Sequence, residues 1–255
     1  MNATEEFQIA GKSKILSVDY NLYSYIALTE DYTLHTPYTS CKLKQKVKHP
    51  IVRIIDNSHF IVAGARTSGY DNALIFDMSG SCIMSFYAGD GVEDMLVHDG
   101  KLIFSYFDEG VYGSNGPNNE GLAVFGSNGK LIFGYNSSQK GEGIDDCYSI
   151  CKAEKDKIFF YAYTPFILTE LSLSTYKCKF YTVPDYLRGS HAISEYFGSI
   201  IFFGSYTQKK QLYKYEPYTG KATGCGSYIG RLQASLQGRF IDVKDHKFSV
   251  ITPML

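Results

Sequence analysis

EDMLVHDGKLIFSYFDEGVYGSNGPNNEGLAVFGSNGKLIFGYN, residues 93 to 136, contains the pattern that decides the fold of this 255-residue chain. Four short runs rich in Leu, Ile, Val and Phe follow one another in it: EDMLVHDG, KLIFSYFDEG, EGLAVFGSNG and KLIFGYN. Gly, Asn, Asp and Ser separate the runs, and no helical period persists through them. Such runs are typical of β-strands joined by tight turns.

The same pattern of four runs recurs along most of the chain. It is clear in residues 51–89, 145–184 and 191–230, and weaker in residues 14–48. Gly80, Gly129 and Gly220 each stand between the third and fourth runs of a copy, where a hairpin turn needs a positive φ. Four strands repeated at roughly 40 to 50 residues predict the blades of a β-propeller, and hence an all-β single domain over residues 1–255.

The two ends of the chain indicate how the ring closes. Residues 238–255 provide only two strand-like runs, so the last blade needs a strand from elsewhere. Residues 7–10, near the N-terminus, are the candidate for that strand. One weak, four clear and one composite copy predict six four-stranded blades. Five blades would result if residues 1–48 and 238–255 together built one unit.

Composition and charge exclude several classes of protein. The chain has 25 Lys and Arg against 26 Asp and Glu, and this balance lacks the basic surplus of a general nucleic-acid binder. No apolar run is long enough to span a bilayer, and the first residues resemble no signal peptide. The six cysteines have no zinc-binding spacing. We therefore expect a cytoplasmic protein with free thiols, no membrane partner and no cofactor.

A candidate binding surface follows from the propeller prediction. The loops that join the second strand to the third, and the fourth strand to the next blade, lie on one face around the central channel. The longest of these loops is YFDEGVYGSNGPNNEG, residues 106–121, and long loops on a fixed scaffold often bind partners. Aromatic and charged side chains of these loops form the predicted partner-binding set: Arg66, Tyr106, Phe107, Asp108, Glu109, Tyr112, Asp145, Asp146, Tyr163 and Tyr206.

The acidic residues of these loops allow three interpretations. They could form a surface that attracts a basic protein. They could bind Ca²⁺, in which case Glu93, Asp94, Asp146 and His191 would be the ligands of a metal-dependent hydrolase or lactonase. They could also cap turns without any function, especially Asp94 and Asp146, which occupy matching repeat positions. No nucleophile motif or zinc spacing is present, so the sequence favours a protein that is not an enzyme.

Part of the chain resembles an uncharacterised family of bacterial propeller-like proteins. The resemblance lies in residues 105–113 (SYFDEGVYG), 121–125 (GLAVF), 144–148 (IDDCY) and 159–166 (FFYAYTPF). The chain has 22 Tyr, 17 Phe and no Trp, whereas that family usually has Trp in its strands. The resemblance implies a bacterial cytosolic protein and no known activity. We expect a non-enzymatic protein-binding propeller with an acidic and aromatic face, as in an immunity protein that neutralises a basic toxin.

Overall fold

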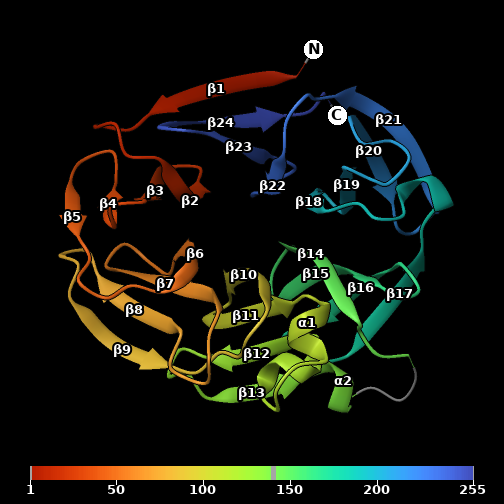
Figure 1. The fold of residues 1–255 in the computed structure, drawn as a ribbon. Coiled ribbons are helices and arrows are strands. Elements are labelled where there is room, and N and C mark those ends of the chain that lie inside the picture. The colour runs from red at the N-terminus through yellow and green to blue at the C-terminus, as the bar shows by residue number, and fades with distance from the viewer. Residues whose placement is uncertain (1, 139–141, 255) are drawn as a thin grey trace.

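Four-stranded antiparallel sheets are arranged around a central axis in a computed structural model that describes residues 2–138 and 142–254 (Figure 1). The chain is a six-bladed β-propeller, as the repeat predicts. None of the helices in the described residues has the length and apolar character that a membrane crossing requires.

Blades 1 to 5 each use four consecutive strands. Blade 1 contains β2 (Ile15–Asn21), β3 (Ser24–Thr29), β4 (Thr33–His35) and β5 (Ser40–Lys42). Blade 2 contains β6 (Lys48–Ile54), β7 (His59–Arg66), β8 (Ala73–Asp77) and β9 (Cys82–Phe86). Blade 3 contains β10 (Val92–His98), β11 (Lys101–Tyr106), β12 (Leu122–Gly126) and β13 (Leu131–Gly134).

The second half of the ring continues the order. Blade 4 contains β14 (Asp146–Lys152), β15 (Lys157–Tyr163), β16 (Ile167–Ser172) and β17 (Cys178–Thr182). Blade 5 contains β18 (Ala192–Tyr196), β19 (Ser199–Phe203), β20 (Gln211–Glu216) and β21 (Lys221–Ser227). Blade 6 contains β22 (Leu232–Ala234), β23 (Phe240–Lys244), β24 (Lys247–Thr252) and, as its outer strand, β1 (Ala3–Gln8).

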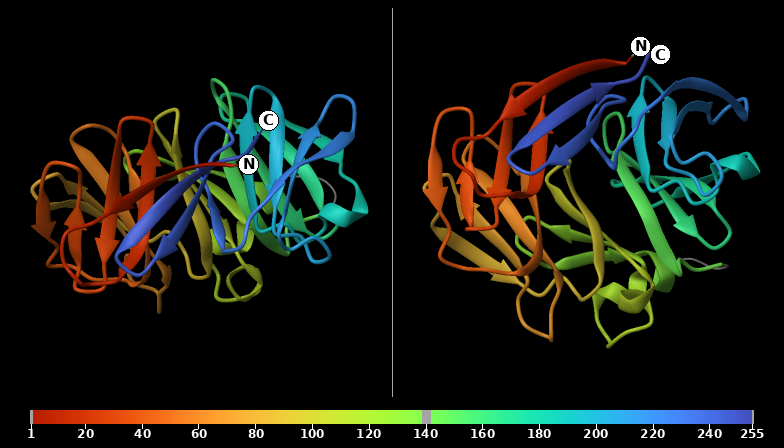
Figure 2. Two further views of the ribbon diagram at one scale, coloured as in Figure 1. Left: turned by 90° about the horizontal axis from the view of Figure 1, so that it is seen from above. Right: turned by 45° about the horizontal axis from the view of Figure 1, so that its top comes forward.

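Blade 6 closes the ring with the N-terminal strand, as expected. β1 pairs antiparallel with β24 from Ala3 opposite Thr252 to Gln8 opposite Lys247, four residues earlier in sequence than the predicted start at residue 7. The two described ends of the chain consequently lie side by side (Figure 2). Phe7 stacks on Phe248 with ring centroids 4.9 Å apart. The short innermost strand β22 was not predicted from the sequence.

Hydrophobic cores lie between neighbouring blades, because a propeller sheet is covered on both faces. On β11, Leu102, Phe104 and Tyr106 pack against blade 2, whereas Ile103 packs against blade 4. This double burial explains why the second strands appear as continuous apolar runs in the sequence and show no polar alternation. Gly80, Gly129 and Gly220 all have positive φ, which confirms the predicted hairpin turns.

The long loop of blade 3 contains two short helices, although no helix was expected there. These are α1 (Asp108–Val111) and the 3-10 helix η1 (Pro117–Glu120). The buried Asn118 side chain donates to the carbonyls of Gly110 and Ser114, at 2.7 and 2.8 Å. A Cβ at Gly110 would lie 2.5 Å from the Asp90 carbonyl oxygen, so α1 sits directly on the backbone that leads into β10. Two other short helices are α2 (Tyr135–Ser138), which follows β13, and the 3-10 helix η2 (Asp185–Leu187), which lies between β17 and β18.

Candidate functional site

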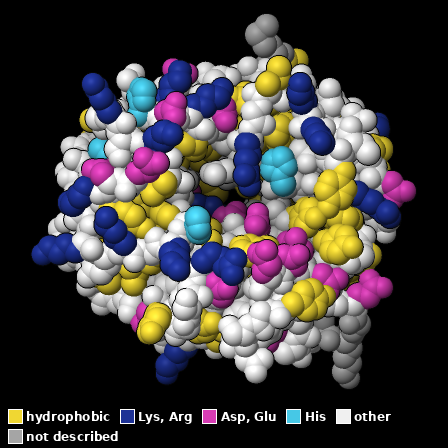
Figure 3. Space-filling view, viewed as in Figure 1, with side chains coloured by type: hydrophobic (Ala, Val, Ile, Leu, Met, Phe, Trp, Pro, Cys, Tyr) yellow, Lys and Arg dark blue, Asp and Glu magenta, His cyan; other side chains and the backbone are white. Residues whose placement is uncertain are grey.

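The face with the predicted loops carries a compact group of acidic and aromatic side chains. β10 begins opposite the end of β11, so the loops between blades and the loops after the second strands share this face, as predicted. Figure 3 shows acidic side chains gathered beside a central hollow, next to a hydrophobic area. The acidic group lies over α1 and the start of β14.

Four rings form an aromatic cluster on blades 4 and 5. Tyr148 lies 5.4 Å from Phe166 and 6.2 Å from Tyr206, between ring centroids. Tyr163 lies 5.3 Å from Phe166, and the Tyr148 and Tyr206 hydroxyls share a hydrogen bond. Tyr163 and Tyr206 remain 43% and 53% exposed. The cluster therefore exposes the rings of Tyr163 and Tyr206 to solvent. Tyr148 and Phe166 pack against these rings and hold them in position.

A glycine gives Tyr206 its place in this cluster. A Cβ at Gly189 would lie 2.4 Å from two carbons of the Tyr206 ring, and Gly189 has a φ of +77°. The Tyr206 amide also donates to the Arg188 carbonyl at 2.9 Å. Any larger residue at position 189 would displace the ring, so the loop between blades 4 and 5 is shaped to hold Tyr206 on the face.

Asp145 connects the aromatic cluster to the long loop of blade 3. Its carboxylate accepts hydrogen bonds from the hydroxyl of Tyr112, which follows α1, and from the hydroxyl of Thr164 at 2.9 Å. The hydrogen bond to Asp145 raises the pKa of Tyr112. The Tyr112 ring is 70% exposed. Asp145 therefore aligns an exposed ring of blade 3 with the exposed rings of blade 4.

Arg66 extends the site towards blade 2. Its Nε donates to Asp90 at 3.1 Å, and its guanidinium lies 3.6 Å from a Glu109 carboxylate oxygen. The same guanidinium lies 5.6 Å from the centre of the Phe107 ring. Asp90 also accepts from the Thr67 amide at 2.7 Å. Arg66 is thus held in place among these groups, and it offsets only part of the acidic charge.

The acids nearest the channel repel one another. Burial, with Asp108 and Glu109 nearby, raises the pKa of Asp146 to about 6. Burial, with Asp94 and Asp146 nearby, raises the pKa of Glu93 to about 7. Glu93 is exposed at the cavity, but protein surrounds its carboxylate on most sides. The carboxylate is therefore only partly solvated. A cation bound at this face would stabilise the charged form of each of these carboxylates.

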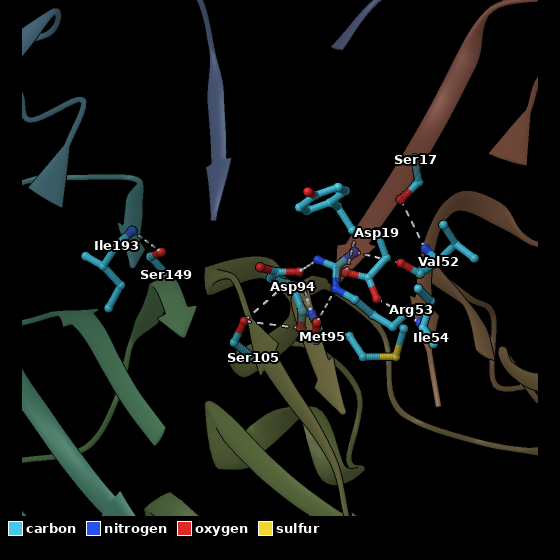
Figure 4. Close-up of polar contacts among 11 residues, drawn as sticks. Ser17, Asp19, Val52, Arg53, Ile54, Asp94, Met95, Ser105, Ser149 and Ile193 are labelled. Carbon is cyan, nitrogen blue, oxygen red and sulfur yellow. Dashed lines mark hydrogen bonds and ion pairs between the residues drawn. The ribbon is translucent and has the colours of Figure 1, made fainter. Parts of the chain in front are cut away.

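Arg53, which no sequence motif marks, lies in the channel wall (Figure 4). Its Nε and one terminal nitrogen donate to the carbonyls of Met95 and Val52, both at 2.7 Å, and its other terminal nitrogen pairs with Asp94. Ser17 and Asp19 of the preceding blade accept from the backbone amides of Val52 and Ile54, at 3.0 and 2.8 Å. Asp94 lies 41 positions further along the chain, so no local sequence pattern indicates this pair.

Most of the predicted partner-binding residues lie together on this face, with one correction. Tyr106 is completely buried, and its hydroxyl donates to the Ala88 carbonyl between blades 2 and 3. It points into the core because Leu102, Phe104 and Tyr106 share one face of β11. Tyr106 therefore cannot contact a partner. The other nine residues belong to the connected groups described above: Arg66, Phe107, Asp108, Glu109, Tyr112, Asp145, Asp146, Tyr163 and Tyr206.

The predicted metal ligands do not form a ligand set. Among residues 2–138 and 142–254, no three His, Cys, Asp or Glu side chains are close enough to hold a metal ion. Asp94 pairs with Arg53, and His191 Nδ1 bonds the Gly204 carbonyl at 3.1 Å. Glu93, Asp94 and His191 do line one cavity, but Arg53 and Arg231 line it with them. The calcium-dependent hydrolase therefore has no support in this geometry.

Comparisons with known proteins agree with the fold. No family model matches the chain, and no curated protein matches it. Virginiamycin B lyase from Staphylococcus aureus is similar, with a TM-score of 0.62 and 7% identity over 99% of each chain. The extracellular domain of a proposed one-component system from B. thetaiotaomicron has a TM-score of 0.59 and 13% identity, over 94% of this chain and 32% of that chain.

PorZ from Porphyromonas gingivalis, described as an essential bacterial surface component of the type-IX secretion system, is a further similar structure. It has a TM-score of 0.55 and 10% identity, over 95% of this chain and 34% of PorZ. The chain thus spans about a third of the PorZ structure and of the B. thetaiotaomicron extracellular domain. At these identities the likeness shows the propeller fold alone.

Proposed function

We propose that this propeller is a protein-binding module that captures a basic partner through its acidic and aromatic face. The observation that carries the proposal is the placement of three exposed tyrosines, Tyr112, Tyr163 and Tyr206, next to carboxylates that lack enough cations. Tyrosine rings are favoured anchors at protein interfaces because they bury a large area and lose little conformational freedom.

The electrostatics of the face favour a partner with Lys or Arg. The pKa of Asp146 is raised to about 6 and that of Glu93 to about 7, since burial and neighbouring carboxylates oppose their charged forms. A partner cation placed between them would stabilise both charged forms. Binding would then release protons near neutral pH, and it would be tighter at pH 8 than at pH 5.5.

The finer proposal concerns the kind of partner. A small propeller that covers a basic surface with an acidic one could neutralise a toxin domain, as an immunity protein does. Cytoplasmic location and bacterial origin, both expected from the sequence, are parts of this proposal. Identification of the captured protein decides the point, since a basic toxin domain supports neutralisation and any other basic protein supports capture alone.

Affinity capture with matched charge variants tests the proposal. Immobilised wild-type protein is compared with Asp108→Lys/Glu109→Lys, and captured bacterial proteins are identified by mass spectrometry. The control is Glu5→Lys/Glu154→Lys, which changes the net charge equally at an exposed strand and at an exposed turn of the opposite face. The partner should be basic, bind wild type and the control, and be lost by the Asp108/Glu109 variant.

A second variant separates the aromatic contribution from the charge. Tyr163→Ala/Tyr206→Ala should weaken the captured partner's binding by about 2 kcal/mol or more, as removal of interface anchors typically does. Thermal melting confirms that each variant is folded. Equal capture by wild type and both face variants would show that the partner binds elsewhere, and the proposed face would be wrong.

A further inference from the structure

A polar cavity of about 140 Å³ opens at the mouth of the central channel. It is far larger than the roughly 10–15 Å³ that one water molecule needs. Polar side chains from several blades line it, among them Ser17, Glu93, Tyr148, His191, Arg231 and Gln233. Figure 3 shows the hollow, with basic and His side chains along one rim and acidic side chains along the other.

The two sides of this cavity carry opposite charges. Glu93 belongs to blade 3, whereas Arg231 directly precedes β22 of blade 6. Blades 3 and 6 are three positions apart in a ring of six, so these residues face each other across the channel. Within the described part of the chain, neither side chain makes an ion pair with the other or with any third residue, whereas Asp94 and Arg53 in the same cavity are paired.

We propose that the channel mouth binds a small zwitterion of the amino-acid type, with its ammonium group at Glu93 and its carboxylate at Arg231. A metal ion does not suit the cavity, because the carboxylates there are accompanied by two arginines. A dianion would meet Glu93, and a dication would meet Arg231. A molecule with one charge of each sign satisfies both free groups and keeps the cavity neutral.

His191 lines the same cavity and offers it a hydrogen-bond acceptor. Its Nδ1 lies 3.1 Å from the Gly204 carbonyl, which only accepts, so Nδ1 carries a hydrogen. Burial, with Arg231 nearby, lowers the pKa of His191, so the ring is neutral and Nε2 is an acceptor. The ring occupies space that only glycine leaves at position 204, where a Cβ would lie 2.0 Å from it.

The electrostatic state of Glu93 favours contact with a cationic group. Burial raises the pKa of Glu93 to about 7; Asp94 and Asp146 add to this rise and Arg231 opposes it. An ammonium group against Glu93 would stabilise its charged form. Perturbed carboxylates of this kind concentrate at binding and catalytic sites.

The test uses glycine, L-alanine, L-serine and β-alanine as probes at up to 10 mM, with binding followed by NMR chemical shifts and by calorimetry. Acetate and methylamine, which each carry one of the two charges, serve as half-probes. At least one zwitterion should bind at least tenfold more tightly than either half-probe. Glu93→Gln and Arg231→Gln should each weaken that binding at least tenfold.

Two variants on the opposite face are the matched controls. Glu154→Gln lies in the turn between β14 and β15, and Arg239→Gln lies in the turn between β22 and β23. Both should bind the zwitterion as wild type does. Absence of binding by all four zwitterions, equal binding of a half-probe, or binding that survives Glu93→Gln and Arg231→Gln would each overturn the proposal. Partner capture is tested at Asp108, Glu109, Tyr163 and Tyr206, none of which lines this cavity, so the two proposals fail separately.

Discussion

Removing the guanidinium group of Arg53 should destabilise the ring more than any surface substitution. In Arg53→Met, the Asp94 carboxylate loses its cation although its side chain is only 22% exposed, and Arg53 itself is 10% exposed. Loss of one partner from a buried ion pair costs about 3–5 kcal/mol. A chain of this size loses about 2–4 °C of melting temperature per kcal/mol, so Tm should fall by about 6–20 °C.

The cost of Arg53→Met should depend on pH in a defined direction. Burial raises the pKa of Asp94 and Arg53 opposes this rise, so the variant has a still higher Asp94 pKa. At low pH Asp94 can take up a proton, and the unpaired negative charge disappears. The free energy lost in the variant should therefore be larger at pH 8 than at pH 5.

Urea unfolding followed by circular dichroism, at pH 5 and pH 8, measures both effects. The double variant Arg53→Met/Asp94→Leu is the control, since apolar replacement of a buried pair is often neutral or stabilising. It should recover most of the stability that Arg53→Met loses at pH 8. A loss below about 1 kcal/mol in Arg53→Met, or an equal loss at both pH values, would refute the reasoning.

Two further predictions concern Glu93 and the closing strand. The folded-state pKa of Glu93 is about 7, above its unfolded value, so the wild type loses stability as the pH rises from about 4.5 to 7. Glu93→Gln should therefore raise stability by about 1 kcal/mol at pH 8, an amount reduced by screening in channel water, and leave it nearly unchanged at pH 4; an equal gain at both would contradict the Glu93 assignment. Phe7→Ala removes the 4.9 Å stack on Phe248 and should lower the free energy of unfolding by about 2 kcal/mol, less than for a fully buried Phe because Phe7 is half-buried. If the variant unfolds in urea at the same midpoint as wild type, the stack does not secure β1.

The blades could be predicted because their information is local and repeated. The second strands are apolar on both faces, and the outer hairpins of blades 2, 3 and 5 have Gly80, Gly129 and Gly220 at positive φ. β22 escaped prediction because it is only three residues long, Leu232–Ala234, and contains a polar Gln. Its place as the innermost strand of blade 6 comes from ring closure, which no local pattern records.

The site was predicted in its location but not in its internal contacts. Sequence spacing placed Asp145 and Tyr163 on the correct face, but the hydrogen bond from Tyr112 to Asp145 crosses between blades 3 and 4. Tyr106 was misplaced because the residue at the end of β11 is the last inward-facing position and not the first of the loop. Arg53 stands within the run Ile51–Ile55, and its pairing with the distant Asp94 appears only in the folded ring.

The pairing of β1 with β24 also determines how the ring responds to force. Ala3 lies opposite Thr252 at one end of this ladder, and Gln8 lies opposite Lys247 at the other. Tension applied at the two neighbouring ends pulls across the strands and loads the pairs one after another, starting at Ala3 and Thr252. A ladder opened pair by pair yields at lower force than one sheared along its length. The contact that closes the ring is therefore also its mechanical weak point, and stretching would peel β1 away while blades 1 to 5 keep all their strand pairs.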